Sequence, residues 1–499
     1  MMTSDAGNKG EQDKNEAQVT SPGVKDNIVT TQHSIKLGGK LLRYTAKVGT
    51  VVLKEEDDKK GHLAKAEMFF MSFTKDGVKD KSKRPITFSF NGGPGSSSVW
   101  MLLGLLGPKR VPLTKSASER LKPPYALSDN EFSLLLESDL VFIDPVGTGY
   151  SRPVTGEDTK PDEFYTFQRD LDSVGEFIRL MTSRENRWGS PKFLIGESYG
   201  TTRATGLAAH LQQHYGMALN GIMLVSVVLN FQTLLFGPGN DLPYVLYLPS
   251  YALAARYHGK LSPRLQKLGE SEFLDEVRGY AEGDYSAALF KGARLDGDER
   301  AQVIKKVSEY TGLSQEYVAG ANLRIEIMRF TKELLRSQQQ VIGRFDSRIT
   351  GIDSNDSGEM FDSDPSMDTA QAIYSACLND FVRKDLQFES DLPYEIISFK
   401  VHPKWRYDSF ENSYVNTAEM LRVAMQKNPN LQVLVVNGLY DLATPFFATE
   451  YTFDHLGVRG DLQDNLKHTY FPAGHMMYTD KGCLKKLTKE IHQFVKKSS

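Results

Sequence analysis

A serine flanked by two glycines, in Gly196-Glu-Ser-Tyr-Gly200, is the residue of this sequence best placed to act as a nucleophile. The apolar run before it predicts a strand, and the small residues after it, 201–210, predict a helix. Gly-x-Ser-x-Gly between a strand and a helix is the layout of a nucleophile elbow, which exposes the serine hydroxyl. The glycines are needed because so sharp a turn presses the strand against the helix. The motif alone leaves an ordinary surface turn open as the alternative.

Two later residues could activate the hydroxyl of Ser198. Asp441 follows the apolar run 431–436, and His475 stands in a Pro/Gly loop after a predicted strand, 467–471. This layout requires an acid and then a histidine, each in a loop after a later strand. The histidine takes the serine proton, and the acid fixes the imidazole tautomer. The chain order therefore predicts a catalytic triad of Ser198, Asp441 and His475.

Three other histidines also follow Asp441. His455 is expected at the end of an amphipathic helix, His468 within a strand and His492 on a surface helix. At such positions a packed or solvated imidazole is the ordinary outcome. The loop position favours His475 as the base.

The segment Asn91-Gly-Gly-Pro-Gly-Ser-Ser-Ser98 is a glycine-rich turn after a predicted strand, 84–90. Such a turn exposes backbone N–H groups, the donors that an oxyanion hole needs. A phosphate cradle is disfavoured because the lysine that ends a P-loop is missing. A flexible loop without a role is the remaining alternative.

The chain of 499 residues is 40% hydrophobic, so it can bury a large core. The length suggests about two to three domain-sized units, although one large elaborated domain fits equally well. The formal net charge of -3 gives no basic field, so no nucleic-acid partner is expected. The only two cysteines, Cys377 and Cys483, exclude a disulfide scaffold and a cysteine-based zinc site, and each is expected to be a small buried residue.

Residues 1–25 are polar and charged without an apolar run, which predicts a disordered tail rather than a signal peptide. No run of about 18 or more apolar residues occurs, so no membrane span is expected. The literal interpretation is a cytoplasmic protein. A trimmed N-terminus would leave a secreted or periplasmic location open.

Period-two patterns between about Ile28 and Phe90 predict antiparallel hairpins at one edge of a mixed sheet. Strands and helices then alternate, which implies a parallel sheet with helices on its faces. Residues 241–391 are mostly helical in pattern, including 251–258, 273–282 and 323–335, and indicate a lid over the carboxyl edge of the sheet. We expect a core in two parts, 26–240 and 392–499, separated by this helical insertion.

Four motifs together are similar to those of a known family. They are the turn 91–98, Asp144-Pro-Val-Gly-Thr-Gly-Tyr-Ser151, the elbow 196–200 and Ala473-Gly-His-Met476. They resemble the serine carboxypeptidases of peptidase family S10, over about residues 85–480. The resemblance implies an α/β-hydrolase fold: a central, mostly parallel sheet with helices on both faces and an inserted, mainly helical lid.

The resemblance also implies roles residue by residue. Ser198 matches the nucleophile, His475 the general base and Asp441 its orienting acid. The amides of Gly93 and Tyr199 match the oxyanion hole; Asn91, Gly92 and Glu197 match the group that binds the substrate's terminal carboxylate; and Met476 matches a residue of the leaving-group pocket. No cofactor and no metal are implied. The partner is a peptide or protein C-terminus as substrate, and a homodimer is open because family members often dimerise.

Glu197 leads to a hypothesis about pH. An ionised Glu197 at about 4 Å from a substrate carboxylate would repel it by about 4 kcal/mol at an effective dielectric constant of about 20, whereas a protonated one could donate a hydrogen bond. We therefore expect peptide binding to strengthen below neutral pH. The alternative is a Glu197 that forms a salt bridge nearby.

The sequence departs from the family pattern at three positions. Ser96 stands at a usual disulfide cysteine, Leu105 at a usual glutamate that supports the carboxylate-binding network, and Leu439 at a usual aspartate two residues before the acid. Leu105 puts the strength of carboxylate recognition in doubt. The expected function is a serine carboxypeptidase acting through an acyl-enzyme and favouring acidic pH. An acyltransferase or esterase on the same scaffold, or a catalytically silent binding protein, remains the alternative.

Two further stretches of the sequence are weaker candidate sites. His210 and His214 are spaced like metal ligands on a helix, but no third ligand is suggested, which favours a solvated face. Asp353-Ser-Asn-Asp-Ser-Gly358 resembles a calcium loop, but its flanks lack clear paired helices, which favours an acidic lid loop.

Overall fold

The computed structural model of the protein describes residues 24–113, 119, 121–155 and 160–499. Within them lies a mixed sheet of ten strands, in the order β1-β2-β3-β7-β4-β9-β10-β13-β14, with β8 paired to β3. The strands of this sheet are β1 (Asn27–Leu37), β2 (Lys40–Asp57), β3 (Gly61–Lys75), β4 (Ile86–Phe90), β7 (Asp139–Ile143), β8 (Arg152–Pro153), β9 (Lys192–Ser198), β10 (Gly221–Val227), β13 (Gln432–Gly438) and β14 (Leu466–Phe471). Two small hairpins, β5 (Lys109–Arg110) with β6 (Ser128–Asp129) and β11 (Val341–Ile342) with β12 (Thr350–Gly351), lie outside it.

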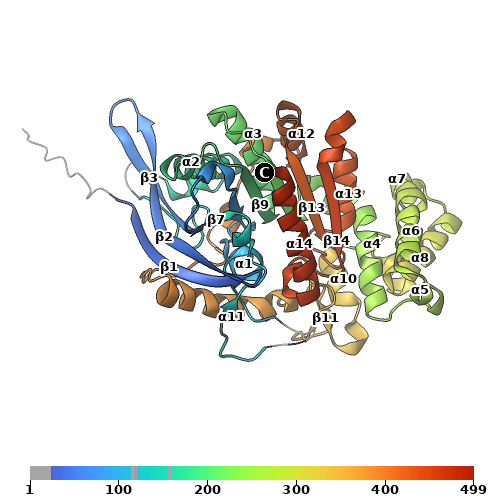
Figure 1. The fold of residues 1–499 in the computed structure, drawn as a ribbon. Helices are drawn as coiled ribbons and strands as arrows, with labels where there is room; N and C mark the ends of the chain where they lie inside the picture. The colour runs from blue at the N-terminus through green and yellow to red at the C-terminus, as the bar shows by residue number, and fades with distance from the viewer. Residues whose placement is uncertain (1–23, 114–118, 120, 156–159) are drawn as a thin grey trace, which may run out of the picture.

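The first three strands form an antiparallel meander at one end of the molecule (Figure 1). Their alternation of polar and apolar residues becomes an alternation of exposed and buried side chains, because successive side chains of a strand point to opposite faces. The predicted hairpins at the edge of a mixed sheet are confirmed. β3 then pairs antiparallel with β7, and this pairing joins the meander to the rest of the sheet.

In the order of the sheet, the neighbouring strands β7, β4, β9, β10, β13 and β14 all pair in parallel. Those at the centre, β4, β7 and β10, are buried along their whole length. Continuous apolar strands of this kind occur where helices cover both faces of a parallel sheet. The carboxyl ends of β4, β9, β10, β13 and β14 therefore meet at one edge, and each of the loops that carry the candidate triad leaves from that edge.

Helices pack on both faces of the sheet and form two buried clusters. One cluster contains apolar residues of α2, α3 and α12, and the other contains those of α1, α11 and α14. The helices of the described residues are α1 (Val99–Met101), α2 (Phe167–Arg184), α3 (Tyr199–Tyr215), α4 (Leu242–Tyr257), α5 (Pro263–Lys267), α6 (Glu270–Tyr280), α7 (Ser286–Lys291), α8 (Gly297–Thr311), α9 (Gln315–Gly320), α10 (Ile327–Glu333), α11 (Pro365–Asp380), α12 (Ala418–Lys427), α13 (Phe446–Asp454) and α14 (Lys481–Ser498).

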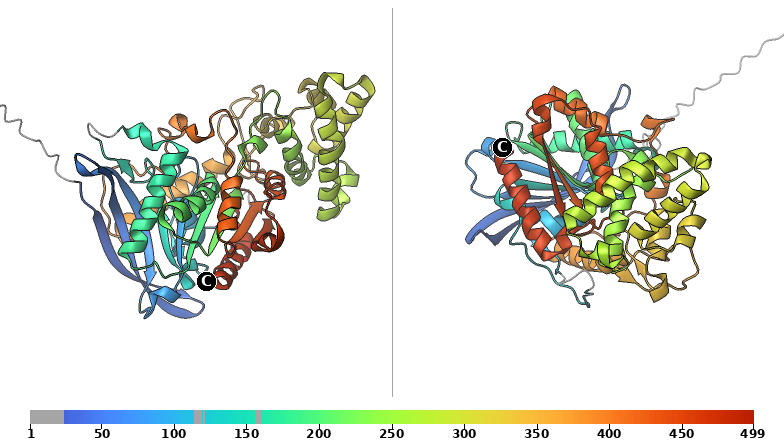
Figure 2. Two further views of the ribbon diagram at one scale, coloured as in Figure 1. Left: turned by 90° about the horizontal axis from the view of Figure 1, so that it is seen from above. Right: turned by 90° about the vertical axis from the view of Figure 1, so that its right-hand side faces the viewer.

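Helices α4 to α10 lie between β10 and β13 in the chain and have a buried cluster of their own, which also includes apolar residues of α13. In both Figure 1 and Figure 2 most of these helices stand at the end of the molecule opposite the meander. Helix α11 lies in the same stretch of sequence, but its buried side chains belong to the cluster on the sheet. That residues 241–391 form a separate inserted domain therefore stays a proposal. Helix α11, which lies within that range, packs with the core.

The structure shortens one predicted helix. The helix expected at 323–335 is α10, Ile327–Glu333, because Asn322 and Leu323 adopt left-handed backbone conformations with φ of 51° and 67° that end helical geometry before it. The expected tail, 1–25, lies outside the described residues except for Val24 and Lys25. None of the helices in the described ranges has the length and apolar character needed to cross a membrane.

Candidate active site

Ser198 ends β9 and directly precedes α3, with φ 61° and ψ -132°. A non-glycine residue in this region is strained, and such strain persists only where the surrounding packing enforces it. The packing is tight here: a Cβ added to Gly200 would lie 2.9 Å from the carbonyl oxygen of Phe90 at the end of β4. The predicted strand, sharp turn and helix around the serine are present.

Asp441 and His475 meet in the loops that follow β13 and β14. Nδ1 of His475 lies 2.7 Å from Oδ2 of Asp441, and the side chain of Asp441 is completely buried. Oδ1 of Asp441 accepts the N–H groups of Ala443 and Thr444, and Oδ2 also accepts the Thr444 hydroxyl. A carboxylate surrounded by donors is an acceptor, so His475 carries its proton on Nδ1 and leaves Nε2 free to accept one.

The main chain ties His475 to the strand beside Ser198. The hydroxyl of Ser226 donates to the carbonyl oxygen of His475 at 2.6 Å, and the next residue, Val227, pairs with Ser198 in the sheet. The imidazole also packs edge-on against Phe345, with ring centroids 5.0 Å apart. Burial alone would lower the pKa of His475, but the charge of Asp441 and its hydrogen bond outweigh burial and raise it.

The two predicted oxyanion-hole amides belong to segments in contact. A Cβ on Gly92 would lie 2.4 Å from the backbone nitrogen of Tyr199, so the turn at 91–98 rests on the first turn of α3. The first N–H groups of a helix have no acceptor within it, and the helix dipole favours negative charge there. Gly93, with φ 106°, adopts a conformation that suits glycine.

Arg203 on α3 fixes this arrangement, and the sequence reasoning missed it. Its guanidinium donates to Asp170 at 2.8 Å and to the carbonyl oxygen of Asn91 at 2.6 Å, and it is fully buried. It also lies over the rings of Phe90 and Tyr199. The signal available in the sequence was a single arginine among the small and apolar residues of 201–209, because a charge on a helix that packs closely against a sheet needs a partner.

Glu197 lies beside Ser198 in a buried network. Nδ2 of Asn91 donates to its Oε2 at 2.5 Å, and the backbone N–H of Met101 donates to Oδ1 of Asn91, which fixes the orientation of the amide. The Tyr478 hydroxyl lies 2.8 and 3.0 Å from the two carboxyl oxygens of Glu197. Burial raises the pKa of Glu197 to about 7, against the lowering effects of His475, Tyr478 and Asn91.

Met476 borders a pocket next to His475. The pocket has a cavity volume of about 80 Å³, is partly open to solvent and is lined mainly by apolar side chains. Its walls include Val111, Ile349, Ala370, Ile373, Tyr374 and Met476. Arg348 also borders it, but this guanidinium is paired with Asp346 at 2.6 Å.

The family model described as serine carboxypeptidase matches residues 58–485. The chain belongs to the serine carboxypeptidase family. The resemblance inferred from the four motifs is thereby confirmed.

Relatives within the family agree. A stretch of 127 residues is 34% identical to the pheromone-processing carboxypeptidase KEX1 of Saccharomyces cerevisiae and covers 25% of this chain and 16% of that protein. Over 409 residues the chain is 23% identical to the lysosomal protective protein of Mus musculus, covering 77% of this chain and 74% of that protein. The aligned part thus spans only about a sixth of the length of the yeast relative.

A solved structure supports the fold. The crystal structure of the prohormone-processing carboxypeptidase from Saccharomyces cerevisiae superimposes with a TM-score of 0.55 at 17% identity, covering 90% of this chain and 91% of that chain. Together with the sheet order, this confirms the predicted α/β-hydrolase fold.

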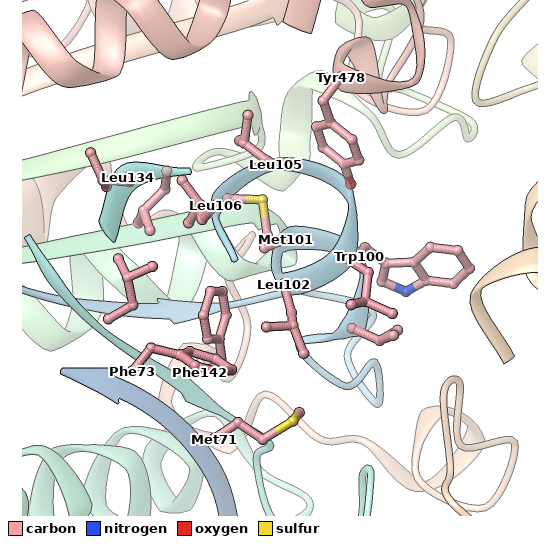
Figure 3. Packing of buried hydrophobic residues seen from close by; sticks show 14 of the residues in the cluster. Met71, Phe73, Trp100, Met101, Leu102, Leu105, Leu106, Leu134, Phe142 and Tyr478 are labelled. Carbon is pink, nitrogen blue, oxygen red and sulfur yellow. The ribbon is translucent and has the colours of Figure 1, made fainter. Parts of the chain in front are cut away.

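The three departures from the family pattern have structural counterparts. Ser96 accepts a hydrogen bond from the indole of Trp100 at 3.0 Å. Leu105 is fully buried in a π-helical turn, Leu102–Leu106, near Tyr478 (Figure 3). Leu439 packs in the cluster of the inserted helices.

The structure also places the weaker candidate metal site and the three histidines that were alternatives to His475. The solvated face expected for His210 and His214 is wrong for His210, which is buried because its ring packs against Gly175 of α2, whereas His214 is exposed and stacks on it at 4.3 Å. Within the described ranges, no group of three or more His, Cys, Asp or Glu side chains could hold a metal. His455 caps the C-terminal end of α13, His468 lies in β14, and His492 on α14 reaches the carbonyl oxygen of Phe132. Cys377 and Cys483 are free and buried, as expected.

The loop that resembles a calcium site surrounds a lysine. The ammonium group of Lys332 binds Oδ2 of Asp353 at 2.5 Å and the carbonyl oxygen of Asn355. Both charged side chains of the pair are almost fully buried. The positive charge that an acidic loop attracts is therefore supplied by the protein itself, which argues against a calcium site; the lid role stays a prediction.

Proposed function

We propose that this protein is a serine carboxypeptidase that hydrolyses the C-terminal peptide bond of peptides through an acyl-enzyme. The observation that carries the proposal is the arrangement at one sheet edge: the buried Asp441–His475 pair at 2.7 Å, tied through Ser226 to the strand beside Ser198. Family membership supports the same reaction.

The reaction proceeds in two stages. Nε2 of His475 takes the proton of Ser198 while the serine oxygen bonds to the scissile carbonyl carbon, and the amides of Gly93 and Tyr199 stabilise the oxyanion. The C–N bond breaks as His475 passes the proton to the leaving amine. Water then gives its proton to His475 and attacks the ester carbon, and the proton returns to Ser198 as the acyl group leaves as a carboxylic acid.

The substrate's terminal carboxylate is bound by Asn91, Gly92 and Glu197 in this proposal. Glu197 can donate to a carboxylate only while protonated, which a pKa of about 7 allows below neutral pH. Met476 and the apolar pocket beside it receive the side chain of the leaving residue. Whether the chain forms a homodimer stays open, and sedimentation of the purified chain tests it.

One set of substrates tests the function. A blocked dipeptide, its C-terminal amide and an ester with the same acyl group are assayed with one enzyme preparation. A carboxypeptidase loses most of its turnover when the terminus is amidated, because the carboxylate contacts are lost. The alternative is an esterase or acyltransferase, because position 105 is a leucine and not a carboxyl residue. Turnover by such an enzyme would not change when the substrate's terminus is amidated.

Labelling by a fluorophosphonate tests the remaining alternative. The proposal requires labelling of the wild-type chain and its loss in Ser198→Ala. A catalytically silent binding protein would show no labelling at residue 198 in either form.

A further inference from the structure

The hydroxyl of Tyr478 is the feature of the site that neither the motifs nor the assigned roles explain. Tyr478 lies in a short turn, Met477–Thr479, between the His475 loop and α14, and its side chain is fully buried. A buried phenol needs a hydrogen-bond partner, and here that partner is Glu197, 281 residues earlier in the chain.

The phenol reaches both carboxyl oxygens of Glu197, at 2.8 Å from Oε2 and 3.0 Å from Oε1. Oε2 of Glu197 accepts from both Asn91 and Tyr478, whereas Oε1 is within reach of Tyr478 alone among the hydrogen bonds of the described residues. Without the phenol, Oε1 would be a buried acceptor with no partner, which costs free energy and leaves the carboxyl free to rotate.

The ring of Tyr478 occupies space beside the departure from the family pattern. A Cβ on Gly104 would lie 2.4 Å from Cε2 of Tyr478 and 2.6 Å from the hydroxyl of Tyr374, so both side chains contact the helical turn that carries Leu105. Figure 3 shows Tyr478 beside this turn. The resemblance to the family implies a carboxyl at the position of Leu105. In this chain that position is apolar, and a phenol approaches Glu197 over the same turn.

We propose that Tyr478 replaces this missing carboxyl as the partner of Glu197 and is the positioning residue for recognition of the substrate's C-terminal carboxylate. The proposal rests on the proposed function. A phenol differs from a carboxyl in one respect that matters here: burial and the charge of Glu197 raise its pKa well above the usual value, so it stays neutral and never competes for the proton of Glu197.

The proton affinity of Glu197 then depends on few groups. Those that face it are the phenols of Tyr478 and Tyr374, the imidazole of His475 and, behind it, the carboxylate of Asp441, together with the uncharged amide of Asn91. Tyr478 donates to the ionised form of Glu197 and so lowers its pKa; removal of the donor raises it. As pH rises, Glu197 loses its proton, and this one deprotonation ends recognition of the substrate carboxylate.

The test compares Tyr478→Phe with the wild type on the free-acid dipeptide and on the ester. We expect kcat/KM for the free acid to fall about 10- to 100-fold, mainly through KM, with ester turnover and fluorophosphonate labelling within about twofold of wild type. The alkaline limb of the free-acid profile moves to higher pH. Tyr285→Phe, which removes an equally buried hydroxyl from the inserted helices, leaves all of these unchanged.

Two further variants test the proposal, and the second does so even if Tyr478→Phe folds poorly. Leu105→Glu in the Tyr478→Phe background restores a carboxyl partner and recovers preference for the free acid. Replacement of Tyr478 by 3,5-difluorotyrosine keeps the ring, strengthens the donor and moves the alkaline limb to lower pH.

Three results separate the outcomes. Equal losses on the free acid and the ester in Tyr478→Phe, or an unmoved alkaline limb in both Tyr478 variants, overturn the positioning role while leaving the carboxypeptidase intact. A wild-type enzyme that turns over the ester but ignores the free carboxyl overturns the proposed function itself, and the role of Tyr478 with it.

Discussion

Gly196 and Gly200 touch across the nucleophile turn: a Cβ added to Gly196 would lie 2.1 Å from the carbonyl oxygen of Gly200. No real Cβ approaches a backbone atom so closely, so either the strand or the helix must move if this hydrogen is replaced by a methyl group. Because Ser198 lies between the two glycines, its strained backbone depends on this contact.

Gly196→Ala should therefore reduce both stability and activity. We expect the free energy of unfolding to fall by about 1–3 kcal/mol through overpacking. kcat on an ester should fall by about 100-fold, since a displacement of about 1 Å suffices for that. Denaturant unfolding and ester kinetics measure the two. Gly279→Ala, on the exposed side of α6 where a Cβ meets open space, is the matched control and should be neutral or slightly stabilising.

Asp441→Asn should abolish most activity without unfolding the chain. The asparagine amide cannot accept from Nδ1–H of His475 in the same way while it also serves the N–H groups of Ala443 and Thr444, so the wrong imidazole tautomer is favoured. We expect kcat on an ester to fall by about 10⁴-fold. The exposed Asp464→Asn should have no effect. Near-normal activity of Asp441→Asn would assign the acid to another residue.

The pH profile should depend on the substrate. Below its raised pKa, His475 is protonated and cannot act as base, so activity on every substrate falls at low pH. Above about pH 7 Glu197 is ionised, so kcat/KM for a free-acid peptide falls again and its profile is bell-shaped. An ester lacks this alkaline limb, and Glu197→Gln removes it from the free acid. A rise for the peptide from about pH 5 to 8 that Glu197→Gln leaves unchanged contradicts the hypothesis.

The pocket beside Met476 predicts a preference for the leaving residue. Its apolar walls and the pairing of Arg348 with Asp346 favour a large apolar side chain over a charged one. Met476→Ala should lower kcat/KM for a C-terminal Leu or Phe by about 10-fold. A substrate that ends in Gly is the internal control, because it fills none of the pocket. A preference of the wild type for C-terminal Asp or Lys would show that the pocket is not used in this way.

Lys332→Met should destabilise the acidic loop. The variant leaves the buried carboxylate of Asp353 without its cation, which costs about 1–3 kcal/mol of folding free energy. Adding Asp353→Leu to Lys332→Met should recover part of the loss, and Lys384→Ala, in an exposed ion pair, should have little effect. Thermal unfolding measures all three. A wild-type melting temperature that rises with added calcium would argue that the loop binds the ion.

By itself the sequence determined the family, the order of strands and helices around the elbow, and the residues of the candidate triad. These are local features. Gly196 and Gly200 flank a serine, Asp441 follows one strand and His475 follows the next. Such patterns depend only on neighbouring residues, so they can be read from the sequence without knowing how distant segments pack.

Only the tertiary structure decided how these segments are supported. Arg203 joins Asp170 to the turn at Asn91, and Tyr478 reaches Glu197 from the far end of the chain. Sequence reasoning could flag Leu105 as a missing carboxyl but could not name what takes its place, because such a partner need only be near in space. Burial adds the second reason: the raised pKa of Glu197 comes first from the side chains that exclude water around it, and no spacing of residues records which side chains those are.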